Sequence, residues 1–495
     1  MRSSWMKLLA ALMAFAMIAA ACGDDDDGGS VASASLEEAE AAAAAAEEAA
    51  AEAEAELAEA EQRAADAEEA AAMAEEEAAA AAEGASSGGD DRPFAGEIVR
   101  ITGPERSPEE WGSIEAAMDL FEEQTGMTII YTGSADWEAE INVQLAAGNP
   151  PDISIFPQPG KLADFARDGL VLPLPDDTTA TVAANWNEAA MGFGLVDGVQ
   201  FGVPNKNDLK SLVWYKPSVF EANGYEIPGT WDELLALTDT MIADGITPWC
   251  VGIGSGNATG WPFTDWTEDL MLRFEGAEAY DRWVTNELPF SSPEVIGIFD
   301  TILDLWNTEG AVFAGGGSIA TTHHSSDNAE GLINDDCAMV RQASFFSAFL
   351  PEGTSDQVSV FYFPSTSDEK PVLGGGTLAG AFNNRAAVWA VMEYFGSPEY
   401  ANARQTAQKD AQGGDGQLSG FNSANLNADR DLWEPLEQSF IEILQTAAVL
   451  RFDGSDLMPA DVGAGTFWTE ATAMVNGEKD SAAAAEAIDA SWPTE

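Results

Sequence analysis

The run "EIVRITGPERSPEEWGSIEAAMDLFEEQTGMTIIYTG", residues 97–133, decides the fold class. Its two ends, 97–103 and 127–133, have the apolar pattern of strands, and 111–126 between them has the spacing of an amphipathic helix that glycine ends. The pattern continues with a helix at 137–150 and a strand at 152–160. Alternating strands and helices predict parallel βαβ units and hence an α/β lobe.

The residues that follow these strands are candidates for a binding site. Ligands of open α/β sheets bind beyond the carboxyl ends of the strands. The strand pattern therefore places three pairs of side chains around one rim: Glu105 and Arg106, Asp136 and Trp137, and Phe156 and Gln158.

The N-terminus has the pattern of a lipoprotein signal peptide, which we assign to residues 1–21. Arg2 and Lys7 precede an apolar stretch from Leu8 to Ala21, and small residues lead to Cys22. This order resembles a bacterial lipoprotein box, in which the cysteine is acylated. We therefore expect a protein on the outer face of the cell membrane, periplasmic or at the cell surface, held by a lipid on Cys22.

Residues 22–92 form a separate acidic segment. Four aspartates open it, and 36–83 consists almost wholly of alanine and glutamate. Alanine favours a long helix, but the many glutamates lack basic partners at helical spacing. A semi-rigid helical spacer and a disordered linker both remain open.

Charge excludes some partners. The chain carries 85 acidic and 21 basic residues, a net charge of −64, and the part after residue 92 is itself strongly acidic. Such a surface disfavours nucleic acid and anionic lipid. We expect no nucleic-acid partner and a monomer.

Three cysteines occur in the chain. With Cys22 assigned to the lipid, Cys250 and Cys337 remain as a pair in a compartment that permits disulfides. We predict that they are bonded; two buried free thiols are the alternative.

The stretch "GWPFTDWTEDL" (260–270) gathers aromatic rings and carboxylates. An aromatic core cluster is one interpretation, because aromatic side chains are mostly buried. A sugar-binding wall is the other: Trp261 and Trp266 would stack on a pyranose, and Asp265 would accept hydrogen bonds from its hydroxyls. Glu268 and Asp269 are expected at the helix start, where carboxylates suit the dipole.

Five longer motifs in order carry a resemblance to a known family. They are "AAGNPPDISIFPQPGKLADFARDGLVLPL" (146–174), "KNDLKSLVWYKPSVFEANGYEIPGTWDELLAL" (206–237), "TPWCVGIGSGNATGWPFTDWTEDLMLRFEGAEAYDRWV" (247–284), "CAMVRQASFFSAFLPEG" (337–353) and "KPVLGGGTLAGAF" (370–382). The chain resembles the extracellular solute-binding proteins of carbohydrate ABC importers, family 1, and most of all the α-glucoside branch. Thr377 and Val340 depart from the residues usual in that branch.

The resemblance implies a periplasmic-binding-protein type II fold, α/β and two-lobed like a Venus flytrap, with three interlobe crossings. The candidate crossings are 205–211, 370–378 and 424–430. Lobe one is then 93–207 plus 376–425, and lobe two is 211–372 plus 428–495. The ligand is expected in the cleft between them, with hinge closure around it.

The resemblance also implies the ligand contacts and the partners. Beside the rim residues and the 260–270 stretch, it places at the sugar Lys206, Arg341, Gln342, Phe345, Gly375, Gly376, Thr377 and Trp468. The expected function is capture of a di- or oligosaccharide such as an α-glucoside, and its delivery to the transmembrane subunits of an ABC permease.

Two alternatives stay open. Arg341 allows an acidic or sulfonated sugar as the ligand, and a glycoside hydrolase would need only two suitably spaced carboxylates. No motif singles out such a pair, so we expect no enzyme, no cofactor and no metal site. His323 and His324 are adjacent, so their side chains diverge, and we interpret them as part of a solvated loop.

Overall fold

The computed structural model describes residues 92–493 except 107, 135, 316 and 367–369. The predicted signal peptide, Cys22 and the Ala/Glu-rich segment therefore lie outside the described residues. No helix in the described part is long and apolar enough to cross a membrane.

A six-stranded sheet confirms the predicted α/β pattern. Its order is β13-β12-β3-β1-β2, and β6 also pairs with β12. β1 runs parallel to β2 and β3, whereas β12 runs antiparallel to β3 and β6. The strands are β1 (Ile98–Gly103), β2 (Thr128–Gly133), β3 (Ile153–Phe156), β6 (Gly202–Leu209), β12 (Val372–Ala381) and β13 (Leu450–Phe452).

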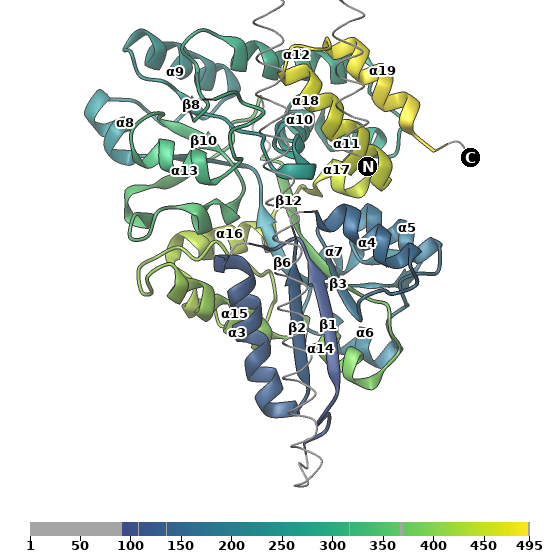
Figure 1. The fold of residues 1–495 in the computed structure, drawn as a ribbon. Coiled ribbons are helices and arrows are strands. Elements are labelled where there is room, and N and C mark those ends of the chain that lie inside the picture. The colour runs from purple at the N-terminus through teal and green to yellow at the C-terminus, as the bar shows by residue number, and fades with distance from the viewer. Residues whose placement is uncertain (1–91, 107, 135, 316, 367–369, 494–495) are drawn as a thin grey trace, which may run out of the picture. The chain divides into compact units, whose positions relative to one another are not determined.

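Helices cover this sheet on both sides (Figure 1). α3 packs on α15, and α14 and α16 contact β6. The helices around the sheet are α3 (Pro108–Thr125), α4 (Trp137–Ala146), α5 (Pro159–Arg167), α6 (Asp176–Ala183), α7 (Glu188–Gly192), α14 (Ala386–Phe395), α15 (Pro398–Ala411) and α16 (Pro435–Thr446). α4 ends before the predicted boundary because Gly148 adopts a φ of 71° and Pro150 follows it.

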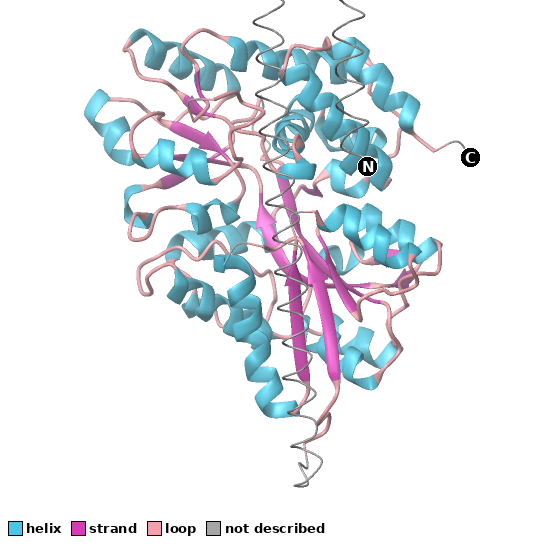
Figure 2. Ribbon diagram, in the orientation of Figure 1, coloured by secondary structure: helices cyan, strands magenta, loops and turns pink. Residues whose placement is uncertain are grey.

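A five-stranded sheet forms the second half, in the order β11-β7-β10-β8-β9. Figure 2 shows the two groups of strands and the helices outside them. The strands are β7 (Leu212–Tyr215), β8 (Trp249–Cys250), β9 (Val312–Phe313), β10 (Met339–Arg341) and β11 (Ser359–Tyr362). Around them lie α8 (Pro217–Asn223), α9 (Trp231–Ala243), α10 (Trp261–Phe274), α11 (Gly276–Val284), α12 (Pro293–Asn307), α13 (Ser326–Ile333), α17 (Gly454–Leu457), α18 (Trp468–Val475) and α19 (Ser481–Ser491). The small hairpin of β4 (Leu195–Val196) and β5 (Val199–Gln200) forms a separate two-stranded sheet.

The chain crosses from one sheet to the other at three places: from β6 to β7, from β11 to β12, and after β13. The lobe boundaries predicted from the sequence stay a prediction. α16 and β13 both follow the candidate crossing at 424–430, yet both contact the six-stranded sheet.

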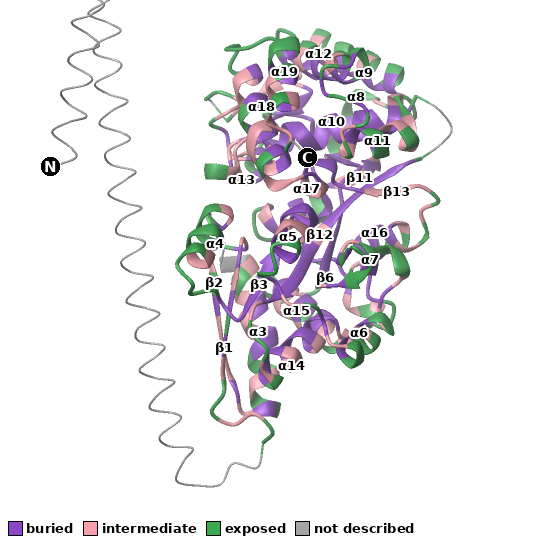
Figure 3. Cartoon of the chain, turned by 90° about the vertical axis from the view of Figure 1, so that its right-hand side faces the viewer, coloured by how far each residue is buried: buried purple, intermediate pink, exposed green. Residues whose placement is uncertain are grey.

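β6 and β12 are buried along their length (Figure 3). Their close approach depends on the glycine triplet of β12. Gly376 has a φ of 151°, and a side chain there would clash with the Lys206 carbonyl oxygen. The glycines therefore allow the two strands to present Lys206 and Thr377 side by side.

Cys250 ends β8, and Cys337 comes shortly before the neighbouring strand β10. Their Cα atoms are 5.4 Å apart and their sulfur atoms are paired. This Cα separation is the usual one for a disulfide.

Candidate functional site

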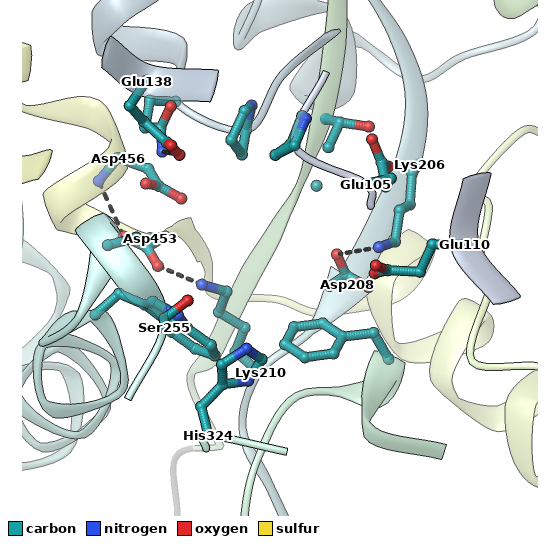
Figure 4. A pocket seen from close by; sticks show the side chains of 18 of the residues that line it. Glu105, Glu110, Glu138, Lys206, Asp208, Lys210, Ser255, His324, Asp453 and Asp456 are labelled. Atoms are coloured by element: carbon teal, nitrogen blue, oxygen red, sulfur yellow. Dashed lines mark hydrogen bonds and ion pairs between the residues drawn. The ribbon is translucent and has the colours of Figure 1, made fainter. Parts of the chain in front are cut away.

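A cavity of about 240 Å³ lies where the six-stranded sheet meets the first turns of α10 and α18 (Figure 4). Residues from both halves of the fold line it. From the six-stranded half these are Pro104, Glu105, Arg106, Glu110, Glu138, Pro157, Gln158, Lys206, Asp208, Gly376 and Thr377. From the crossings and the five-stranded half they are Lys210, Ser255, Ala258, Trp261, His323, His324, Phe345, Phe349, Asp453, Ser455, Asp456 and Trp468.

Aromatic rings form one wall of the cavity. Trp261 is the first residue of α10 and Trp468 the first of α18. They approach closely because Gly260, at a φ of 116°, has no side chain to strike the Trp468 carbonyl oxygen. The ring centroid of Phe345 lies 6.0 Å from that of Trp261. Such flat apolar faces suit the C–H face of a sugar ring.

Lys210 lies at the crossing between β6 and β7 and faces the cavity. Its Nζ is 3.0 Å from Asp265 Oδ1, donates to Asp453 Oδ2, and lies 5.6 Å from the Trp261 ring centroid. Burial opposes its charge, but Asp265 and Asp453 outweigh burial and hold the pKa of Lys210 well above its usual value. Lys210 therefore stays charged, and its ammonium group connects the crossing after β6 with α10, through Asp265, and with the segment after β13, through Asp453.

A second charged group lies at the other end of the cavity. Lys206 Nζ is 3.8 Å from Asp208 Oδ2 and 5.4 Å from the Phe345 ring centroid. Burial raises the pKa of Asp208, although Lys206 lowers it. Glu105 Oε1 is 3.4 Å from Arg404 Nη2 behind the wall.

His324 corrects the expectation of a solvated loop. It is only 7% exposed, lines the cavity, and its ring centroid is 4.7 Å from that of Trp261. Burial, His323 and Arg106 hold its pKa well below the usual value. Its imidazole is therefore neutral near pH 7, with one ring nitrogen bonded to Ser325 Oγ at 2.7 Å.

Nine of the residues predicted from the sequence line the cavity: Glu105, Arg106, Gln158, Lys206, Trp261, Phe345, Gly376, Thr377 and Trp468. Their contact with a ligand stays a prediction. Most of them follow the carboxyl ends of strands or lie in the family motifs, as expected for a ligand site at the edge of an α/β sheet.

Asp265 and Arg341 do not line the cavity but support it. Arg341 pairs with Asp265 at 2.9 Å and with Asp269 at 2.6 Å, and Asp269 pairs with Arg273 at 2.6 Å. Burial opposes ionisation of Asp269, but both arginines outweigh it and lower its pKa. Because the Arg341 guanidinium is satisfied inside the protein, it offers no charge to an acidic sugar.

The expectation of a stacking surface is not met for Trp266, which is 3% exposed and packs against Trp249, Trp306 and Phe363. Trp137 and Phe156 are likewise core residues; the Trp137 indole donates to Ser154 Oγ. The position of Trp266 along α10 explains its burial, because the first residue of α10 lines the cavity while later turns face the core.

The remaining predicted residues lie beside the cavity. Asp136 is exposed at the rim and accepts a hydrogen bond from Asn257 Nδ2 at 2.5 Å. The side-chain amide of Gln342 is 3.2 Å from the His324 carbonyl oxygen, and Gly375 packs against the Lys210 side chain. Glu268 and Asp269 do not lie at the helix start: both are wholly buried further along α10.

Three buried carboxylates could in principle hold a cation, since Asp265, Glu268 and Asp453 each offer an oxygen within 4.8 Å of the others. Lys210 already lies between two of them. Burial, Asp453 and Asp265 raise the pKa of Glu268 well above its usual value, which disfavours the ionised form that a metal ion would need.

Sequence reasoning missed several cavity carboxylates, Glu110, Glu138, Asp208, Asp453 and Asp456. Asp453 had a signal: in "FDGSD" it precedes a short helix and accepts from the Asp456 backbone as an N-cap. Lys210 lies within the quoted motif "KNDLKSLVWY", but its motif alone does not show which lysine faces the cavity.

Two sheets joined by three chain passages, with a polar cavity walled by aromatic rings between them, define a two-lobed solute-binding protein. The chain belongs to the bacterial extracellular solute-binding proteins, whose family model matches residues 108–402. This match confirms the resemblance to extracellular solute-binding proteins that the sequence motifs indicated.

Two relatives match most of the chain. The alpha-glucosides-binding periplasmic protein AglE of Rhizobium meliloti (strain 1021) is 39% identical over 415 residues, 80% of this chain and 87% of AglE. The osmoprotective compounds-binding protein GgtB of Synechocystis sp. is 37% identical over 393 residues, 78% of this chain and 90% of GgtB. Both are binding proteins rather than enzymes by name.

Solved structures support the fold. The bacterial solute receptor AcbH has a TM-score of 0.66 at 20% identity, and covers 80% of this chain and 98% of its own. Maltose-bound MalE3 of T. maritima has a TM-score of 0.62 at 16% identity, and covers 79% and 98%. These likenesses confirm the two-lobed α/β fold.

Proposed function

We propose that this protein captures an α-glucoside of about disaccharide size in the cavity and delivers it to the transmembrane subunits of an ABC permease. The observation that carries the proposal is the cavity itself: aromatic faces at Trp261 and Trp468 stand opposite hydrogen-bonding groups of the six-stranded half. A neutral sugar needs both, because its affinity comes from ring contact and from charge-assisted hydrogen bonds. The similarity to AglE supports an α-glucoside.

The cavity volume limits the ligand. At about 240 Å³ it is smaller than the usual small-molecule site, which has roughly 300 to 1,000 Å³. A compact disaccharide or a glycoside of similar size fits this volume better than a long oligosaccharide.

The setting outside the cytoplasm completes the proposal. A lipid on Cys22 would hold the protein at the membrane, the Ala/Glu-rich spacer would carry the lobes away from it, and the Cys250–Cys337 disulfide would fasten β8 to β10. The protein would act as a monomer without a cofactor and without catalysis.

A second candidate ligand is an osmoprotective compound, because GgtB is nearly as similar as AglE. A ligand of either class would occupy the same cavity. The satisfied Arg341 argues against an acidic or sulfonated sugar.

A thermal-shift screen followed by calorimetry tests the proposal. The purified full-length chain is mixed with maltose, trehalose, sucrose and methyl α-glucoside, with a β-glucoside as the matched control. We expect a rise in melting temperature and micromolar affinity, about −8 kcal/mol, for at least one α-glucoside. Binding of none of them would overturn the proposal, and steady release of nitrophenol from nitrophenyl α-glucoside would make the protein an enzyme.

A further inference from the structure

Two carboxylates from opposite halves of the fold face each other across one end of the cavity. Glu138 lies in the first turn of α4, and Asp456 lies in α17 beyond the third chain passage. Both line the cavity, and Figure 4 shows their side chains pointing toward one another.

Within the described part of the chain, neither carboxylate has an ion pair. Glu138 Oε1 receives only a long hydrogen bond of 3.4 Å from Gln158 Nε2, and the nearby Lys161 donates to the Glu138 backbone oxygen instead. Lys210 is already bound to Asp265 and Asp453. Arg106 lowers the pKa of Glu138 only as a lesser influence beside burial.

The surroundings of Glu138 and Asp456 disfavour negative charge at this end of the cavity. Burial raises the pKa of Glu138. Burial also raises that of Asp456 well above its usual value, and Asp453 and Glu138 add to the effect. Like charges at close range repel unless a donor or a proton lies between them.

We infer that Glu138 and Asp456 form a cross-cleft carboxylate pair that selects ligands by their hydrogen-bond donors. This end of the cavity takes a hydroxyl-bearing or ammonium-bearing group of the sugar and rejects a sugar carboxylate. The inference rests on the proposed function, because it assumes that a sugar occupies the cavity.

The physical reason is the asymmetry between donors and acceptors. A carboxylate accepts hydrogen bonds and donates none when ionised, so a hydroxyl can bridge the pair and an ammonium can bridge it with charge assistance. A uronate would bring further negative charge to an end of the cavity that already disfavours ionised carboxylates, and like-charge contacts of this kind are unfavourable. The ligand bridge also connects α4 to α17, which belong to opposite sides of the cavity.

Calorimetry on the full-length protein tests this pair. The probes are maltose, trehalose and methyl α-glucoside, each beside its C6 carboxylate and its 6-amino counterpart. The double variant Glu138→Gln with Asp456→Asn replaces both carboxyl groups with neutral amides of nearly the same shape. Glu140→Gln and Asp461→Asn, exposed carboxylates near the same two elements, are the matched controls.

For the wild type we expect the neutral sugar to bind more tightly than its uronate by about tenfold or more, and the amino sugar at least as tightly as the neutral one. In the double variant both preferences should shrink about tenfold, mainly through better uronate binding, while the controls keep the wild-type ratios. The melting temperature of the variant should not fall, since repulsion is removed; if it does not fold, the two single variants give the same comparison. Unchanged ratios in the variant, or a wild type that prefers the uronate, would overturn this inference alone. Failure of every probe to bind the wild type would overturn the proposed function as well.

Discussion

The two tryptophans of α10 offer the sharpest comparison of a ligand contact with a core residue. Trp261 is half-buried at the cavity wall, where it touches His324 and Lys210. Trp266, on the same helix, is enclosed by other aromatic rings. Replacing each with alanine therefore removes the same side chain from two different environments.

Trp266→Ala should lower the free energy of unfolding by about 3 to 5 kcal/mol, the usual cost of a buried aromatic side chain. Trp261→Ala should change the ligand-free stability much less. Its loss should appear in sugar affinity, at about 1 to 3 kcal/mol, a range taken from aromatic stacking on nucleobases. That corresponds to a dissociation constant roughly 5- to 150-fold larger.

Urea unfolding without ligand and calorimetry with the α-glucoside found in the screen measure the two quantities. A variant of Trp261 that unfolds as easily as that of Trp266, and that binds the sugar with wild-type affinity when folded, would refute the stacking role. Equal losses of affinity in both variants would show instead that α10 acts as one rigid unit.

Lys210→Met should destabilise the protein by about 3 to 5 kcal/mol, because it leaves buried Asp453 without its cation and Asp265 with Arg341 alone, and urea unfolding measures this loss. Glu268→Gln should flatten the dependence of the unfolding free energy on pH. The folded pKa of Glu268 is raised, so its stabilising contribution is fully present below the unfolded pKa of about 4.3 and is lost as pH rises above that value. If the unfolding free energy changed equally between pH 4 and 7 in both proteins, this expectation would be wrong. Reducing the bond between Cys250 and Cys337 should cost about 4.6 kcal/mol for a separation of 87 residues on the chain-entropy model. Unfolding with and without reductant measures this cost, and alkylatable thiols in the untreated protein would exclude the bond. Cys22→Ser should move the protein out of the membrane fraction, whereas an unchanged fraction and mass would exclude the lipid anchor.

The sequence predicted those parts of the fold that depend on local pattern. The first two βαβ units follow from apolar spacing, and the rim of the site follows from where parallel strands end, which is why Glu105 and Gln158 were found. Charge clusters were harder to interpret. Asp265 and Arg341 lie in a recognisable motif, but the sequence does not reveal that each is the other's partner 76 residues away.

Burial explains the other differences. A helix that begins at a cavity shows only its first turn to the ligand, so Trp261 and Trp266 differ although both belong to one aromatic stretch. His324 shows the opposite case: its position next to His323 suggested a solvated loop, yet packing against Trp261 and Phe349 places its ring in the cavity wall. Neither outcome can be read from residue type, because both depend on segments distant in the chain.

The position of Lys210 connects ligand contact to the relation between the two halves. It belongs to the passage from β6 to β7, while its partners Asp453 and Asp265 belong to the passage after β13 and to α10. A ligand beside Trp261 would therefore lie near the Lys210 ammonium group. The ion pairs of this group connect two of the chain passages with α10, which carries Trp261. A ligand shifts a conformational equilibrium only through contacts that differ between its states. Contacts at Lys210 and across Glu138 and Asp456 meet this condition, because moving one half relative to the other changes the distances between these groups, whereas contacts to the core of a single half would not.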